Sequence, residues 1–280
     1  MHVATYDSAQ AFVEVAEPFL LLHEVHNSLL LGNALRRIHG LPSVDGAVTY
    51  AAVFEGDQPV GAASHQPPFP VILSAGMSPQ AIATLAKHML ATGWPLTGIT
   101  GPESQTAAFA AVWHTLTGEQ ASIKQRQGVY ALYAVRTRGT ASGQLRPAGP
   151  DDLPLVAAWS QGFHDEATPD QPGFDAQEFA RRRVADGSVY LWEDGGRVVS
   201  MAARARPTRH GITVNLVYTP PELRGRGYAT ACVAALSQQL LDAGYTFCTL
   251  FTDLGNPTSN HIYQQIGYER ICDFVIYQFA

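Results

Sequence analysis

The chain has 280 residues, which is enough for about two domains. Hydrophobic residues make up 46% and charged residues 15%, so the chain can bury a core and is not intrinsically disordered. The net charge is −6, and no basic run exceeds Arg181-Arg182-Arg183, which argues against nucleic acid as a partner. Apolar runs are far shorter than the roughly 18 residues of a membrane span, and the N-terminus lacks a secretory signal pattern. We therefore expect a cytoplasmic protein with no membrane partner.

The cysteines and histidines do not follow the spacing of a metal site. Cys232, Cys248 and Cys272 form neither an even set nor a close pair, so we expect them to fill apolar space in a reducing compartment. The ten histidines are scattered and include no HExxH pattern. The sequence therefore predicts no disulfide and no metal.

The first half of the chain resembles the second half. The segment 50–64 predicts a strand, a glycine turn and a second strand, and 190–204 predicts the same hairpin 140 residues later. An amphipathic helix over 109–118 resembles 260–268, and a strand follows each, at an offset of 149 residues. These repeats predict an internal duplication in which the second half carries about nine extra residues between hairpin and helix.

The two halves are joined by a short polar segment. Residues 139–147 are mostly small or polar and end at a proline, which is typical of a linker. We therefore divide the chain into a domain over 1–138, a linker over 139–147 and a domain over 148–280. A helix is expected to begin near Asp151 and Asp152, where the helix dipole favours acids.

The residues 212–230 carry the strongest chemical signal. A β-branched strand over 212–219 ends at a double proline, a glycine loop follows, and an amphipathic helix begins near residue 229. Glycines let consecutive backbone N–H groups point at one spot, and the helix N-terminus adds positive potential. Such a loop is suited to a pyrophosphate. It is neither a P-loop nor a dinucleotide fingerprint, because it has neither spacing.

The glycine loop resembles the R/Q-x-x-G-x-G/A pyrophosphate loop of the GNAT superfamily of acyl-CoA-dependent N-acetyltransferases. The residues that carry this resemblance are Arg224, Gly225, Arg226, Gly227, Tyr228 and Ala229. Downstream, 246–252 is similar to the family's next strand, and 256–268 resembles its N-x-x-S/A-x-x-x-Y-x-x-x-G-F/Y segment. The resemblance covers about 190–280. It implies an α/β fold of two tandem GNAT-like domains, each a mixed, mostly antiparallel sheet flanked by helices.

The resemblance is incomplete in the first half, which looks like a degenerate copy. The segment 71–90 occupies the place of 214–241 but has no Arg-Gly-x-Gly, and His114 stands where the second half has Tyr263. Without the glycine loop the first half has no set of N–H donors for a pyrophosphate. We therefore predict one acetyl-CoA site per chain, in the second half.

The family resemblance also implies how acetyl-CoA is held in the second half. Pantetheine is expected between two splayed strands, bonded to the backbone of Val217 and Thr219, with a backbone N–H near Val217 or Tyr218 polarising the thioester carbonyl. The side chains expected to bond the pantetheine arm are those of Asn256, Ser259 and Asn260.

Tyr263 is the expected general acid, because a phenol with a pKa of about 10 can protonate a departing thiolate of about 8.5. An alternative for Tyr263 is a core aromatic residue. Glu166 is the expected general base, with a solvated acidic helix end as the alternative reading. His164 and His210 are further possible bases, and Asp165 or Asp170 could attract a cationic substrate.

The resulting hypothesis is transfer of an acetyl group from acetyl-CoA to a primary amine, by direct transfer in a ternary complex. The acceptor would be a small molecule or a peptide, and the protein a monomer or a homodimer. Two alternatives stay open: a non-catalytic CoA-binding sensor, and a tandem acetyltransferase similar to mycothiol synthase.

Overall fold

A computed structural model describes residues 1–41, 46–137, 139–169 and 173–280. Its helices and strands occur in the same order in the two halves, apart from two short 3₁₀ turns in the second half. The first half comprises β1 (His2–Tyr6), α1 (Ala9–Leu21), α2 (Glu24–Ile38), β2 (Thr49–Glu55), β3 (Gln58–His65), β4 (Val71–Leu73), α3 (Pro79–Ala91), β5 (Gly98–Pro102), α4 (Glu103–Thr117) and β6 (Ala121–Leu132). The second comprises β7 (Gln144–Pro147), α5 (Leu153–Ala167), α6 (Ala176–Ala185), β8 (Val189–Asp194), β9 (Arg197–Ala205), β10 (Gly211–Tyr218), α7 (Tyr228–Asp242), β11 (Phe247–Asp253), α8 (Pro257–Ile266) and β12 (Glu269–Phe279). This repeated order is what the predicted duplication requires.

The strands form one continuous sheet of 12 strands, in the order β1-β2-β3-β4-β5-β12-β6-β11-β10-β9-β8-β7. Among the described strands, the pairs β4·β5 and β10·β11 are parallel and the others antiparallel. Each parallel pair is linked by a helix, because parallel neighbours need a crossover connection. The predicted mixed, mostly antiparallel sheet is confirmed.

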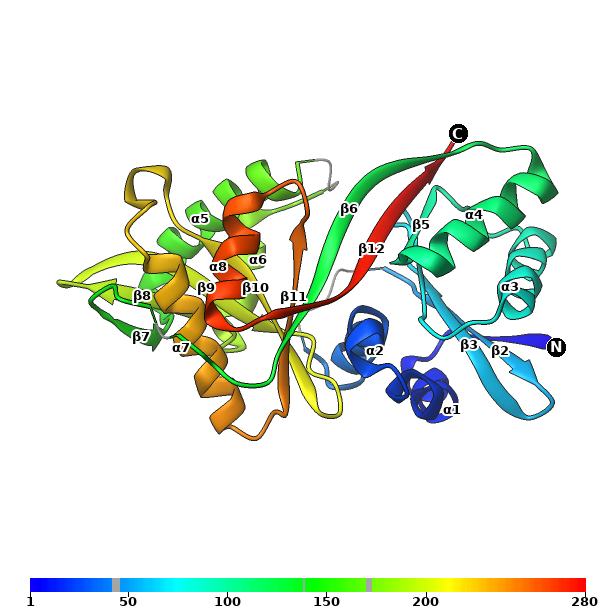
Figure 1. Cartoon of the computed structure of the whole chain (residues 1–280), viewed down its shortest axis with the longest axis horizontal. Helices are drawn as coiled ribbons and strands as arrows, with labels where there is room; N and C mark the ends of the chain where they lie inside the picture. The colour runs from blue at the N-terminus through cyan, green and yellow to red at the C-terminus, as the bar shows by residue number, and fades with distance from the viewer. Residues whose placement is uncertain (42–45, 138, 170–172) are drawn as a thin grey trace.

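The two halves exchange their last strands. The strand β6 of the first half pairs with β11 of the second, and β12 of the second half pairs with β5 of the first. At the centre β6 and β12 pair with each other over most of their length, from Glu269↔Ala131 to Phe279↔Ala121. Figure 1 shows these two long strands crossing from one lobe to the other. Each half therefore completes the other's sheet.

Helices cover the sheet and enclose three apolar cores. In the first half α1 to α4 contribute buried side chains to a single core around Phe12, Leu31 and Leu85. In the second half α7 and α8 pack on one face, around Leu236 and Ile266. The helices α5 and α6 pack on the opposite face, around Trp159. Ile212 and Val214 of β10 belong to the core beneath α7 and α8, whereas Leu216 belongs to the core beneath α5 and α6.

Most predicted elements are present, with one difference in the linker. Both hairpins form, as β2·β3 and β8·β9. The helices α4 and α8 end at Gly118 and Gly267, both in the left-handed region. Residues 144–147 of the predicted linker form β7 instead, which pairs with β8. Leu145 packs against the core there, so a pairing partner overrides a polar, proline-ended sequence.

The extra residues of the second half lie between its parallel strand and the following helix. The strands β4 and β10 begin at Val71 and Gly211, an offset of 140 residues, whereas α3 and α7 begin at Pro79 and Tyr228, an offset of 149. The difference therefore falls on the end of β10 and on the glycine loop.

Two further expectations concern the cysteines and the membrane. All three cysteines are free thiols, and Cys232 and Cys248 are buried. In the described part of the chain we find no helix with the length and apolarity of a membrane span.

Candidate active site

The strands β10 and β11 separate after a short parallel pairing. Their last paired residues are Thr213 and Thr249, whose hydroxyls lie 3.0 Å apart. Beyond this pair β10 contains a bulge, because its register with β9 shifts between Asn215 and Tyr218, and Leu216 has a φ of +52°. A bulge bends its strand and leaves one residue unpaired. The two strands thus separate after Thr213 and Thr249, ahead of Val217, where the family resemblance places a backbone donor.

The glycine loop that follows β10 can bind an anion. Gly225 and Gly227 have φ values of +76° and +78°, and no atom lies within 4 Å of a Cβ built on Gly225. Gly227 is the N-cap of α7, and no side chain caps this end. The first N–H groups of a helix need acceptors, and an uncapped N-terminus attracts negative charge. The loop geometry therefore fits a pyrophosphate.

The corresponding connection in the first half is closed by its own side chains. The turn 74–78 joins β4 to α3, and the Ser78 hydroxyl caps the helix by accepting the N–H of Ala81. The buried Asn27 of α2 accepts the N–H of Ala75 at 2.8 Å. Because these donors are already satisfied, little is left for a phosphate at this turn.

Arg224, which is predicted to bind the pyrophosphate, is in direct contact with Glu166, which is predicted to act as the general base. The Arg224 guanidinium donates to both carboxylate oxygens of Glu166, at 2.7 and 2.9 Å. Its Nε donates to the Thr219 carbonyl, and its charge lies 5.8 Å from the centre of the Tyr218 ring. Glu166 and Arg224 are about half exposed. The structure thus places the predicted base beside the glycine loop.

Tyr263 is nearly buried in the core beneath α7 and α8. Its ring packs edge-on against Tyr268, with centroids 6.0 Å apart, and 8% of the residue is exposed. Burial raises the pKa of Tyr263 to about 12. Its hydroxyl bonds to no other group in the described part of the chain. The group therefore stays protonated at neutral pH and is able to donate.

Asn256 and Asn260 already have partners within the protein. The side chain of Asn256 caps α8 by accepting the N–H of Ser259 at 3.1 Å. Asn260 donates to the carbonyls of Asp253 and Asn256, and its oxygen accepts from the Tyr130 hydroxyl at 3.2 Å. These bonds hold the start of α8 against β11. Contact of either side chain with pantetheine remains a prediction.

The alternative bases lie in different surroundings. His164 is buried, stacks on Phe174 with centroids 4.4 Å apart and bonds Thr168. His210 lies at the junction of the halves, where its Nδ1 is 2.7 Å from Glu24 of α2. Asp165 accepts from Gln161. Asp170 lies outside the described residues.

Two hydrogen bonds near the site could not be foreseen from the sequence. The hydroxyl of Tyr228, the first residue of α7, donates to Asp194 at the end of β8 at 2.9 Å. Tyr130 reaches Asn260 although it belongs to the first half. Both contacts depend on strand neighbours that local patterns do not reveal, β6 beside β11 above all.

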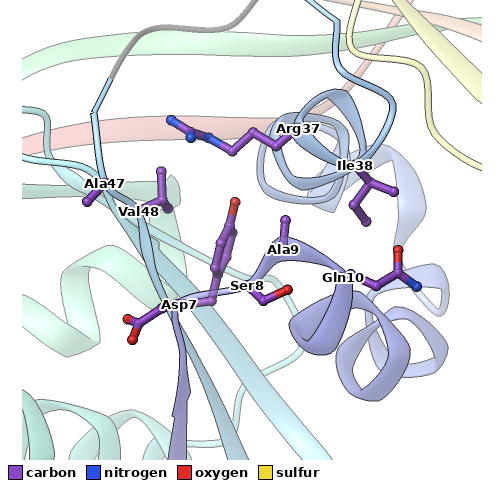
Figure 2. A pocket seen from close by; sticks show the side chains of 9 residues that line it. Asp7, Ser8, Ala9, Gln10, Arg37, Ile38, Ala47 and Val48 are labelled. Atoms are coloured by element: carbon purple, nitrogen blue, oxygen red, sulfur yellow. The ribbon is translucent and has the colours of Figure 1, made fainter.

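Two cavities are lined mainly by residues of the first half. One of about 510 Å³ is lined by His23, His26, Glu103 and Cys272, at the place where the second half has its strand opening. The other, of about 450 Å³, lies between the start of α1 and the end of α2. Figure 2 shows Arg37 and Asp7 at opposite sides of this second cavity. Neither includes a glycine loop.

The described residues contain no group of three or more histidine, cysteine or acidic side chains placed to share a metal ion.

Comparison with known proteins gives the family of the second half. Residues 154–268 match the model of the acetyltransferase (GNAT) family, whose members use acetyl-CoA. No curated protein matches the chain.

Solved structures match almost the whole chain. An acetyltransferase of the GNAT family from Colwellia psychrerythraea is 10% identical with a TM-score of 0.62, and the match covers 100% of this chain and 99% of the other. A GCN5-related N-acetyltransferase from Sphaerobacter thermophilus is 14% identical with a TM-score of 0.62, covering 98% and 94%. A tandem GNAT protein from the clavulanic acid biosynthesis pathway is 12% identical with a TM-score of 0.57, covering 100% and 98%. At these identities the likeness concerns the fold.

The repeated element order, the glycine loop and these matches agree. The chain has the fold of a tandem GNAT protein, and its second half belongs to the acetyltransferase (GNAT) family.

Proposed function

We propose that the chain transfers an acetyl group from acetyl-CoA to a primary amine of a small molecule or peptide, in a ternary complex at the second half. The observation that carries this proposal is the uncapped N-terminus of α7, preceded by two left-handed glycines and lying beside the opening of β10 and β11. The division into 1–138, 139–147 and 148–280 is part of the proposal, with the last strands exchanged. The first half then acts as a scaffold.

The reaction requires the protein to bind the pyrophosphate, to stabilise the thioester oxygen and to position the pantetheine arm. The backbone N–H groups of Gly225, Gly227 and the first turn of α7 bind the pyrophosphate, with Arg224 and Arg226 at the rim. The backbone near Val217 and Tyr218 stabilises the negative charge that develops on the thioester oxygen, an interaction worth about 3 kcal/mol. Ser259, Asn256 and Asn260 border the pantetheine arm.

The amine nitrogen attacks the thioester carbon, the carbon–sulfur bond breaks, and the electron pair leaves with the sulfur. Tyr263 donates to that sulfur. The pKa of Tyr263 is raised to about 12, whereas that of the departing thiol is about 8.5. The equilibrium for full proton transfer from the phenol to the thiolate is therefore unfavourable by roughly 10³- to 10⁴-fold. Tyr263 therefore acts on the departing sulfur as a hydrogen-bond donor and keeps its proton while the thiolate leaves.

Glu166 takes the amine proton in this proposal, directly or through water. Its ion pair with Arg224 gives a way to test this role against a purely electrostatic one. We expect Glu166→Gln to lower kcat about 100-fold if the carboxylate is the base. If it only orients Arg224, the same variant should raise the KM for acetyl-CoA and leave kcat unchanged, and the base would then be sought at His164.

A thiol-release assay with acetyl-CoA and a panel of amines, amino acids, peptides and aminoglycosides tests the function. Release that depends on the acceptor supports the proposal. Binding of CoA without release on any acceptor would favour a sensor instead. Release confined to an amino sugar that is a thiol precursor would favour the mycothiol-synthase-like alternative.

A further inference from the structure

Four arginines gather where the first half meets the second. They are Arg36 of α2, Arg183 of α6, Arg204 of β9 and Arg206, which follows β9, and we refer to them as the arginine cluster. Their charges act on one another: Arg36 and Arg183 lower the pKa of Arg206, and Arg36 and Arg204 lower that of Arg183. Burial is the larger cause in both cases, and it brings the pKa of Arg206 to about 9.

Among the described residues, the cluster lacks the carboxylates that such charges usually require. Asp186 acts on Arg36 and Arg183, but no member of the cluster forms an ion pair with a carboxylate in the described ranges. The Nε atoms of Arg183, Arg204 and Arg206 are buried without an acceptor, and Arg183 is only 4% exposed. Buried guanidinium groups are normally paired, because the loss of hydration is costly. This surplus of positive charge among the described residues points to an anion as the missing partner.

The arginine cluster lies next to the opening between β10 and β11. The Nη2 of Arg183 donates to the Arg204 carbonyl at 3.0 Å and to Asn215 Oδ1 at 3.3 Å. The guanidinium of Arg206 lies 5.6 Å from the centre of the Phe251 ring. Asn215 and Phe251 are each two residues beyond the last paired threonines, on the same face of their strands. The cluster therefore borders the opening from one side of the sheet.

This side of the sheet is opposite to Tyr263. Leu216, next to Asn215, packs with α5 and α6, whereas Tyr263 packs in the core beneath α7 and α8. A molecule that reaches the opening past the cluster would thus approach the thioester from the side away from the proposed acid.

The backbone holds Arg206 in place against a helix of the first half. Arg206 has a φ of +45°, which is unfavourable for a residue with a side chain. A Cβ added to Gly32 of α2 would lie 2.7 Å from the Arg206 Cβ, so glycine is required for this approach. A strained residue that the surroundings fix in this way is typical of a binding site.

We propose that the arginine cluster binds an anionic group, a carboxylate or a phosphate, carried by the acceptor. The inference rests on the proposed function, because it gives the substrate class of the same site. The acceptor's amine would lie at the opening of β10 and β11 while its anionic group is held by the guanidinium groups. The anionic group takes no part in making or breaking bonds.

Binding alone is tested first, with inorganic phosphate as the probe and no acetyl-CoA present. We expect phosphate to raise the melting temperature of the full chain, and the Arg206→Gln variant to lose part of that increase, because the open glycine loop can bind phosphate as well. Arg209→Gln is the matched control, since Arg209 is in the same loop but is exposed and paired with Glu17. An equal phosphate effect in Arg206→Gln and wild type would overturn the proposal.

Kinetics with paired acceptors then identify the anionic group. Phosphoethanolamine is compared with ethanolamine, and β-alanine with its amide, so that each pair differs only in the anionic group. We expect the anionic member of one pair to have the higher kcat/KM, and Arg206→Gln to raise its KM about 10- to 100-fold. The KM for acetyl-CoA should not change. A preference for the uncharged members would contradict the proposal.

The anion site and the proposed acetyl transfer can be disproved separately. If phosphate stabilises the wild type through Arg206 but no amine is acetylated, the anion site stands and the proposed function falls. If amines are acetylated but phosphate acts equally on wild type and Arg206→Gln, and this variant only raises the melting temperature, the cluster is an unpaired buried charge and the anion site falls.

Discussion

The connections β4–α3 and β10–α7 join equivalent elements, but the N-terminus of the following helix is capped by a side chain only in the first half. In the first half Ser78 caps the helix and Asn27 takes a turn N–H, so the polar groups of the turn are satisfied internally. In the second half two glycines precede a helix that no side chain caps. The same fold is thus stabilised by internal hydrogen bonds in one copy and left with open donors in the other. Open donors are what a ligand needs.

The largest expected effect separates the two tyrosines of the second core. We expect Tyr263→Phe to lower kcat about 10²- to 10³-fold, because it removes the proposed hydrogen-bond donor to the sulfur and keeps the ring. Tyr268→Phe is the control: its hydroxyl bonds Ser237 at 2.8 Å, so the variant should lose stability but keep its turnover. Steady-state thiol release at several pH values measures both. Unchanged turnover in Tyr263→Phe at every pH would remove this residue from the mechanism.

The raised pKa of Tyr263 predicts how the stability of the chain depends on pH. Its pKa is about 12 in the folded chain against about 10 in an unfolded one. The folded chain therefore keeps a proton that the unfolded chain loses, and stability should fall as the pH rises above about 10. In chemical denaturation, Tyr263→Phe should show a smaller loss between pH 10 and 12 than the wild type. An identical loss would show that other groups cause it.

The next effect contrasts the turn glycines of the two halves. Gly227→Ala places a Cβ on a left-handed residue in the loop, which costs about 1–2 kcal/mol and distorts the N–H donors. We expect affinity for acetyl-CoA to fall about 10-fold or more by calorimetry. The counterpart is Gly76→Ala, at a φ of +82° in the first half. It should lower the melting temperature and leave the affinity intact.

The stoichiometry of binding tests the first half directly. We expect one acetyl-CoA per chain, and Asn27→Ala should not create a second site, because freeing the N–H of Ala75 does not supply a glycine loop. The variant leaves a buried donor without a partner, so it should cost about 1–3 kcal/mol of stability. Two equivalent acetyl-CoA sites in the wild type would contradict the prediction that the first half binds no acetyl-CoA.

The smallest effect concerns how α7 is anchored. Tyr228→Phe removes the hydrogen bond to Asp194 and should cost about 1 kcal/mol. We expect a slightly lower melting temperature and at most a few-fold change in acetyl-CoA affinity. A larger loss of affinity than in Gly227→Ala would mean that Tyr228 contacts the ligand.

Local patterns in the sequence were sufficient for much of the fold. The hairpins, the glycine stops at Gly118 and Gly267, and the order of strand, glycine loop and helix depend on neighbouring residues, and each is present. The missing loop of the first half followed from the offset between the two copies. These features are local in physical origin, so a single sequence is enough to predict them.

Contacts between distant segments could not be predicted. The pairing of Glu166 with Arg224 depends on how α5 is placed against the loop. The arginine cluster combines α2, α6 and the end of β9, and its members look like ordinary surface residues in sequence. Strand neighbours are also set by tertiary packing, so the pairing of β6 with β11 had no local signal.

The exchange of β6 and β12 has a consequence for how the chain is made. β12, which pairs with β5, is synthesised after the other strands of the described sheet, so β5 keeps an open edge while the second half is being made. Domains usually fold one by one as they emerge, but here the sheet of the N-terminal lobe is completed only when the 11-residue β12 has been made. A stop codon shortly before β12 would therefore leave the lobe at the other end of the chain incomplete.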